Sequence, residues 1–198
     1  MTQDTLLALT VLALAMVWTP GPNNALVAAS GANFGFRRSL PHVLGIAFGF
    51  ALMIFVVGFF LGELFQASAL LREGLRWGGA ALLLWLAWKV ATSGGISFGR
   101  GEPRPFTLVE AMAFQWINPK AWAMAIAISG QFILAEAPLV SAAIVGTVFV
   151  LAGLTSASGW AWAGQALSRW LATPARLRLF NVAMAGLIVA SVGLILVG

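Results

Sequence analysis

The amino-acid sequence predicts an all-α membrane protein with six transmembrane helices. Of its 198 residues, 61% are apolar and only 9% are charged, whereas a soluble domain carries roughly 25% charged residues. The apolar residues gather in stretches of about twenty, the length that a helix needs to cross a hydrocarbon core about 30 Å thick. Two of these stretches contain an internal proline, so helices 1 and 4 are expected to be broken.

Short polar segments separate the predicted spans. The first apolar run, 6–18, follows Asp4 instead of a basic segment and has no cleavage pattern after it. We therefore interpret it as part of span one and not as a signal peptide. The long polar connection at 93–105 is rich in glycine and proline and lies near the middle of the chain. The six spans are 5–33 with a break at 20–22, 41–62, 70–91, 107–132 with a break near 119, 138–163 and 177–197.

The two internal prolines relate the two halves of the chain. Pro20 and Pro119 lie 99 residues apart, which is half of 198. Because each half has three spans, the second half must enter the membrane from the opposite side, which gives an inverted 3+3 repeat. We predict a single transmembrane domain over 1–198. It consists of repeat one at 1–92, a linker at 93–105 and repeat two at 106–198.

The loop charges predict the orientation of the chain in a bacterial cytoplasmic (inner) membrane. Lys and Arg are enriched in cytoplasmic connections. Eight of them follow spans one, three and five, and only two follow spans two and four. Both termini are therefore expected in the periplasm. The eight are Arg37, Arg38, Lys89, Arg100, Arg104, Arg169, Arg176 and Arg178, and the two are Arg72 and Arg76.

Each break places polar side chains inside a span. An internal proline removes one helical hydrogen bond and costs roughly 3 kcal/mol. In lipid, protein groups or cavity water must satisfy the freed backbone, and side-chain amides can do so or bind a polar solute. We assign to a substrate pathway Thr19, Pro20, Gly21, Pro22, Asn23 and Asn24 in span one and Gln115, Asn118, Pro119 and Lys120 in span four.

The breaks also expose helix ends within the membrane. Amide-rich N-termini attract anions such as carboxylates, and carbonyl-rich C-termini attract cations. Two facing breaks would suit a zwitterion, as in transporters built from inverted repeats. Lys120 would bind the substrate carboxylate or neutralise carbonyls that Pro119 frees. Alternatively, its side chain extends to the membrane interface.

Two further ionisable residues are candidates for proton or substrate coupling. Glu110 lies eight residues before Asn118 and hence on nearly the same helical face, although a solvated position near the cytoplasmic end fits it equally well. His42 is the only histidine and would titrate near neutral pH in a proton relay. Its place at the start of span two, close to Arg37 and Arg38, favours an interfacial position instead.

Three motifs, in this order, resemble the LysE/RhtB family of amino-acid exporters, the LysE-type translocators. The motifs are Thr19-Pro20-Gly21-Pro22, then Gly35-Phe36-Arg37-Arg38 followed by Gly45 and Gly49, and finally Asn118-Pro119-Lys120-Ala121. They cover about the first two thirds of the chain, and the last third matches only in hydropathy. The sequence departs from the family pattern at Ser39 and Ala111, where glycine is common.

The resemblance implies a secondary transporter that exports amino acids or close derivatives from the cytoplasm, driven by the proton motive force and without a cofactor. Combined with the inverted repeat, it predicts alternating access around the two broken helices. No enzymatic activity, catalytic residue or metal site is expected. The expected partners are the lipid bilayer and a small amino-acid-like substrate. A homodimer is an open alternative, since small residues such as Gly45 and Gly49 let helices approach closely.

Other functions fit the sequence less well. The net charge of +5 comes from eleven scattered basic residues, so no nucleic-acid surface is predicted. An exporter of divalent cations would need several buried carboxylates, histidines or thiolates. The chain has no cysteine, and Glu63, Glu110 and His42 are few and dispersed. An intramembrane serine enzyme would have only Ser158 and His42 to pair as nucleophile and base. Export of another small solute stays an alternative.

Overall fold

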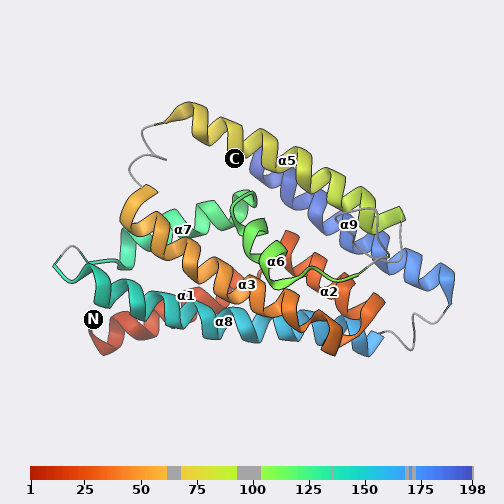
Figure 1. Ribbon diagram of the computed structural model, residues 1–198, viewed down its shortest axis with the longest axis horizontal. Coiled ribbons are helices and arrows are strands. Elements are labelled where there is room, and N and C mark those ends of the chain that lie inside the picture. The colour runs from red at the N-terminus through yellow and green to blue at the C-terminus, as the bar shows by residue number, and fades with distance from the viewer. Residues whose placement is uncertain (62–67, 93–103, 135, 168–169, 171–172, 198) are drawn as a thin grey trace.

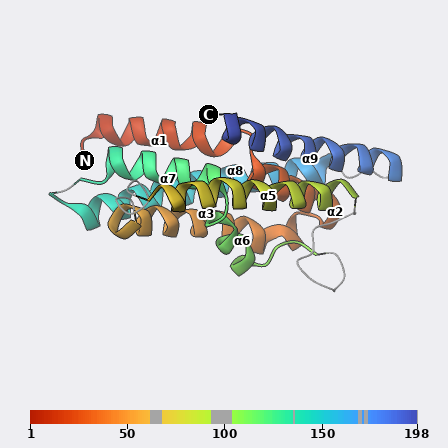
Figure 2. The same ribbon diagram turned by 90° about the horizontal axis from the view of Figure 1, so that it is seen from above.

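The computed structural model describes the chain except for residues 62–67, 93–103, 135, 168–169, 171–172 and 198. In the described part all regular secondary structure is helical, which confirms the predicted all-α class. The helices form an elongated bundle (Figures 1 and 2). Most of the predicted linker at 93–105 lies outside the described residues, and only Arg104 and Pro105 of it are placed.

Two helices that meet at an angle occupy the region of the first predicted span. α1 (Gln3–Trp18) and α2 (Pro22–Phe34) are bent by 60° relative to each other. Pro20 and Pro22 have no backbone N–H, so two carbonyls near the end of α1 cannot receive the usual helical bond. At the first position of α2, however, the missing N–H of Pro22 costs nothing. The sequence therefore favours both the end of α1 and the start of α2.

A second pair of helices occupies the region of the fourth predicted span. α6 (Leu108–Gln115) ends three residues before α7 (Pro119–Phe132) begins. The side-chain oxygen of Asn118 accepts a hydrogen bond of 3.1 Å from the backbone N–H of Lys120. Asn118 therefore caps the N-terminus of α7, and a proline follows it at the first helical position, as is common.

Most of the remaining helices are long and run along the bundle. They are α3 (Phe36–Val56), its continuation as a short π-helix η1 (Val57–Leu61), α5 (Ala69–Thr92), α8 (Pro138–Leu167) and α9 (Pro174–Val197). α3 and α8 run antiparallel beside each other, and α5 pairs with α9 (Figure 1). α2 also packs on α8, and α6 packs on α3. α3 and α8 thus support the two pairs of short helices.

Glycines bring α2 and α8 into backbone contact. A Cβ atom built on Gly31 would lie 1.9 Å from the carbonyl oxygen of Ala161, and one on Gly164 would lie 2.1 Å from the carbonyl oxygen of Ala28. No side chain fits at these distances, so both positions require glycine. Close backbone approach of this kind is typical of helices that pack in membranes.

The glycine pair of span two packs inside the molecule. A Cβ on Gly45 would lie 2.5 Å from the Cβ of Ala111, and one on Gly49 would lie 2.6 Å from the Cα of Met112, both on α6. Both glycines therefore serve the contact between α3 and α6 within the chain. Ala111 and Ser39, the two departures from the family pattern, are both fully buried.

Substitution of Gly31 by alanine is expected to destabilise the protein by about 1–3 kcal/mol, because overpacking forces the backbones of α2 and α8 apart. The melting temperature of the purified protein in detergent measures this effect. Gly146→Ala, on α8 where nothing lies within 4 Å of an added Cβ, is the matched control and should be neutral or slightly stabilising. Equal melting temperatures for the two variants would contradict the close contact between α2 and α8.

Three described helical segments are long and apolar enough to cross a membrane, namely Phe36–Phe59, Pro138–Leu167 and Pro174–Gly193. The bent pair of α1 and α2 counts as a fourth if it forms one span. α5 is 24 residues long but carries four charged residues, which lowers its mean hydropathy. The predicted number of six spans is therefore not confirmed by length and composition.

Candidate functional site

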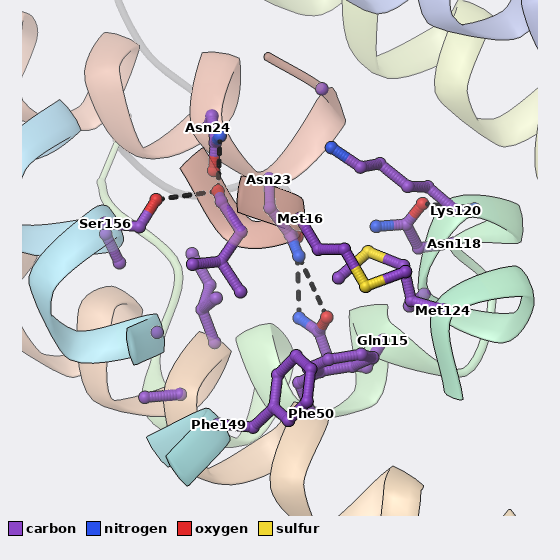
Figure 3. A pocket seen from close by; sticks show the side chains of 17 residues that line it. Met16, Asn23, Asn24, Phe50, Gln115, Asn118, Lys120, Met124, Phe149 and Ser156 are labelled. Carbon is purple, nitrogen blue, oxygen red and sulfur yellow. Dashed lines mark hydrogen bonds between the residues drawn. The ribbon is translucent and has the colours of Figure 1, made fainter. Parts of the chain in front are cut away.

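A pocket lies where the two pairs of short helices meet, and α3 and α8 complete its wall (Figure 3). The empty space within it, open solvent included, is about 520 Å³. Residues from both predicted breaks line it: Gly21, Asn23, Asn24, Gln115, Asn118 and Lys120. The other predicted pathway residues, Thr19, Pro20, Pro22 and Pro119, adjoin these in the chain but do not line the pocket.

Two side-chain amides join the breaks across 92 residues of sequence. The Asn23 amide nitrogen donates to the Gln115 side-chain oxygen at 2.9 Å, and the Gln115 amide nitrogen approaches the Asn23 oxygen at 3.4 Å. The Gln115 amide nitrogen also donates to the carbonyl of Ala111 within α6 at 2.9 Å. Both side chains point into the pocket (Figure 3), so each offers its amide to a bound solute as well as to its partner.

The carbonyl end of α1 is held by polar side chains from three elements. The Asn24 amide donates to the carbonyls of Val17 and Thr19, both at 3.0 Å. The Ser156 hydroxyl, on α8, donates to the Val17 carbonyl at 2.8 Å. The Lys120 ammonium, on α7, donates to the Thr19 carbonyl at 2.7 Å. These bonds satisfy backbone that the bend between α1 and α2 leaves outside a helix.

The rest of the pocket wall is apolar. Phe50 of α3 and Phe149 of α8 contact each other edge to face, with ring centroids 5.4 Å apart. They lie on the opposite side of Gln115 from Asn24 (Figure 3). The large apolar lining residues are Met16, Val17, Ile46, Phe50, Met124 and Phe149. A ligand of this pocket would thus meet polar groups at the helix ends and apolar side chains elsewhere.

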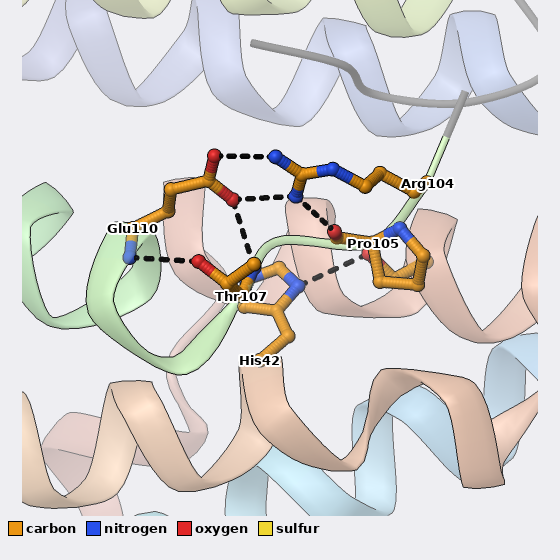
Figure 4. Close-up of polar contacts among 6 residues, drawn as sticks. His42, Arg104, Pro105, Thr107 and Glu110 are labelled. Atoms are coloured by element: carbon orange, nitrogen blue, oxygen red, sulfur yellow. Dashed lines mark hydrogen bonds and ion pairs between the residues drawn. The ribbon is translucent and has the colours of Figure 1, made fainter. Parts of the chain in front are cut away.

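Glu110 lies outside the pocket, in the first turn of α6 (Figure 4). Its carboxylate accepts two hydrogen bonds of 2.7 Å from Arg104 and one of 2.8 Å from the backbone N–H of Thr107. Its own backbone N–H donates to the Thr107 hydroxyl, which completes a capping box. The hydrogen bond with Glu110 raises the pKa of Arg104. Glu110 therefore starts α6 and anchors the end of the linker.

Glu110→Gln and Arg104→Gln are expected to leave at least half of wild-type efflux. The side chains of Arg104 and Glu110 are 42% and 26% exposed, respectively. Ion pairs that are partly exposed in this way contribute about 1 kcal/mol or less to stability. Export assays at matched membrane abundance test this expectation. A loss of efflux in Glu110→Gln but not in Arg104→Gln would place Glu110 in the transport pathway after all.

His42 is fully buried within the protein, and its predicted position near the membrane interface stays a prediction. Its Nδ1 atom lies 3.0 Å from the hydroxyl of Ser30 on α2, and its ring stacks on Phe106 with centroids 4.8 Å apart. Its Nε2 atom has no hydrogen-bond partner among the residues that the structure describes. The side chain is covered because α2 and the segment before α6 both pack on this turn of α3. His42 does not line the pocket.

The described residues contain no group of three or more histidine, aspartate or glutamate side chains that could hold a metal ion. Among the described pocket-lining residues, Lys120 is the one with an ionisable side chain, and its charge is positive. A cation such as a divalent metal would therefore meet repulsion there. The chemistry of the pocket favours a ligand that offers a carboxylate together with hydrogen-bond donors and acceptors.

Comparisons with known proteins identify the family of the chain. A family model described as LysE type translocator matches residues 14–198. Proteins named cysteine/O-acetylserine efflux protein, from Escherichia coli strain K12 and Shigella sonnei strain Ss046, are each 31% identical over 173 residues, 85% of this chain and 87% of the relative. No solved structure matches the chain. The chain belongs to the LysE type translocator family and is a multi-pass membrane transporter, not an enzyme.

Proposed function

We propose that the chain exports small neutral amino acids, of the class that includes cysteine and O-acetylserine, from the bacterial cytoplasm across the inner membrane. The names of the relatives supply the chemical class. The single observation that carries the proposal is the amide pair of Asn23 and Gln115, which joins the two breaks at the pocket. Amides bind either end of a zwitterion because they both donate and accept.

The wall of the pocket fits a neutral amino acid better than a basic one. The carboxylate of the substrate would meet the N-terminus of α2, where Gly21 provides no side-chain cap. The apolar wall around Phe50 and Phe149 would receive a short uncharged side chain. A basic side chain would find no carboxylate among the described lining residues.

Alternating access between two inverted repeats is the proposed mechanism. The helix contacts are reciprocal, as two related halves would require: α1 packs on α8 while α6 packs on α3, and α2 packs on α8 while α7 packs on α3. α3 pairs with α8, and α5 with α9. This pattern supports repeats at 1–92 and 106–198, with α1–α2 and α6–α7 as the two broken spans. The repeats would rock about the pocket and expose it first inward, then outward.

The orientation in the inner membrane can be tested by labelling, since the natural chain has no cysteine. Gln3→Cys is expected to react with a membrane-impermeant maleimide in spheroplasts, because the loop charges predict that both termini lie in the periplasm. Thr173→Cys, in the connection before α9, should react only after the membrane is permeabilised. The reverse pattern would contradict the proposed orientation.

A homodimer remains a proposal of its own. The glycines Gly45 and Gly49 make contacts inside the molecule, but no described atom lies within 4 Å of a Cβ added to Gly74 or Gly78 of α5. Such a face supports close approach of another helix in lipid. The mass of the purified protein in detergent, measured by light scattering with the detergent contribution subtracted, distinguishes a dimer from a monomer.

The function itself is tested with cells that contain or lack the protein. We expect cells with the protein to resist toxic concentrations of cysteine and to release more O-acetylserine than cells without it. A panel of amino acids, toxic analogues and divalent cations defines the class. Protection against basic amino acids or cations alone would contradict the proposed class, and protection against none of them would contradict export of amino acids.

A further inference from the structure

Among the described residues that line the pocket, Lys120 is the one with an ionisable side chain. The other polar groups in the wall are amides, the Ser156 hydroxyl and backbone, which keep one charge state at all physiological pH values. If transport is coupled to protons at the pocket, the proton must therefore reside on Lys120. This inference rests on the proposed function, and it assigns the coupled proton to one atom, Nζ of Lys120.

No other described charge faces this ammonium group. α2 and α8 contain no ionisable residue, and Asp4 is the only one in α1. On α6, Glu110 is paired with Arg104. On α5, the packing contact is Gly79 against Pro119, and Glu73, six residues earlier, accepts a hydrogen bond from Trp77. α3 carries Arg37 and Arg38, which are exposed, and His42, which is buried against Ser30 and Phe106.

The Lys120 ammonium occupies the position that a substrate ammonium would need. It donates to the carbonyl of Thr19 at 2.7 Å, at the C-terminal end of α1. Carbonyl-rich helix ends attract cations, and the neighbouring Val17 carbonyl already accepts from Asn24 and Ser156. Gly21 permits this arrangement, since a Cβ there would lie 2.9 Å from Nζ. Two ammonium groups on one carbonyl oxygen would repel each other.

We propose that Lys120 carries the antiported proton, and that its ammonium and the substrate ammonium alternately donate a hydrogen bond to the Thr19 carbonyl. When a neutral amino acid binds, an Nζ–H bond of Lys120 breaks, the proton passes to water and the electron pair stays on nitrogen. The substrate ammonium then donates to the Thr19 carbonyl. After release of the substrate, Lys120 takes up a proton and returns to this carbonyl. Proton and substrate thus exclude each other, which is the condition for exchange.

Nitrogen NMR tests the charge of Lys120 directly, because Lys89 is the only other lysine. In Lys89→Arg protein labelled with ¹⁵Nζ-lysine, Lys120 gives the single lysine signal, and Lys89 lies outside the pocket. S-Methyl-L-cysteine serves as a neutral probe without a thiol. At neutral pH we expect an ammonium signal in the empty protein and a neutral amine signal at saturating probe. An ammonium signal that persists in the probe-bound protein would overturn the proposal.

Calorimetry in two buffers of different ionisation heat separates this proposal from the proposed function. For wild-type protein we expect a proton to be released on binding of the probe, and affinity that rises with pH by up to tenfold per unit between pH 6 and 7.5. Lys120→Arg should lose both effects. Binding without proton release in the wild type would overturn the role of Lys120 but leave export intact, whereas absence of any binding would count against the substrate class itself.

Discussion

Alanine at Lys120 or at Asn118 is expected to lower efflux of O-acetylserine to less than about a tenth of the wild-type rate. Lys120 provides the ammonium group of the pocket, and a hydrogen bond to a charged group contributes roughly 1.5–3 kcal/mol, or tenfold and more in rate. Asn118 caps α7 and lines the same pocket. Efflux is measured with radiolabelled substrate in cells that hold equal amounts of each variant in the membrane.

Two substitutions serve as matched controls for this pair. Lys89→Ala removes the other lysine, which lies over the ring of Trp85 on α5, and Asn181→Ala removes a buried amide on α9 outside the pocket. Both should keep most of the efflux rate if they reach the membrane. Normal efflux from Lys120→Ala and Asn118→Ala together would remove the basis for the proposed site.

Loss of either amide that joins the breaks is expected to reduce efflux about as strongly as alanine at Lys120 or Asn118. Asn23→Ala removes the donor to the side-chain oxygen of the buried Gln115, and Gln115→Ala removes the acceptor of the partly buried Asn23 amide. An unsatisfied buried polar group costs about 1–3 kcal/mol. Because the two side chains act as one unit, the double variant should be no worse than the worse single variant. A double-mutant cycle on efflux rates measures this coupling.

The amide pair of Asn33 and Asn181 is the control for this cycle. It also joins two helices, with the Asn33 amide nitrogen 3.2 Å from the Asn181 side-chain oxygen, but it lies outside the pocket. Its variants should lower stability without a specific loss of efflux. Strictly additive effects of Asn23→Ala and Gln115→Ala would show that the two breaks are not coupled through these side chains.

The features that depend on local sequence could be predicted. Pro20, Pro22 and Pro119 cannot donate a helical hydrogen bond, and the described helices end and begin around them. Asn118 caps a helix because an asparagine directly before a proline suits that position. Gly45 and Gly49 allow close packing in lipid wherever their helix meets another. Each of these inferences needs only a few neighbouring residues.

The features that depend on helix pairing could not be predicted. Phe50 and Phe149 look like any apolar span residue until α3 and α8 are placed beside the breaks. Nothing in the local sequence of Ser156 points to the Val17 carbonyl at the end of α1. The burial of His42 depends on Phe106, 64 positions further along the chain. Orientation in the membrane and the number of spans stay predictions.

The central claim is that a neutral amino acid passes through the pocket between the two breaks. Exchange of radiolabelled O-acetylserine by purified protein in liposomes tests it most directly. Wild-type protein should exchange internal for external substrate much faster than protein-free liposomes, and Asn118→Ala should reduce the rate at least tenfold. No exchange by folded wild-type protein, or an equal rate in Asn118→Ala, would contradict the account.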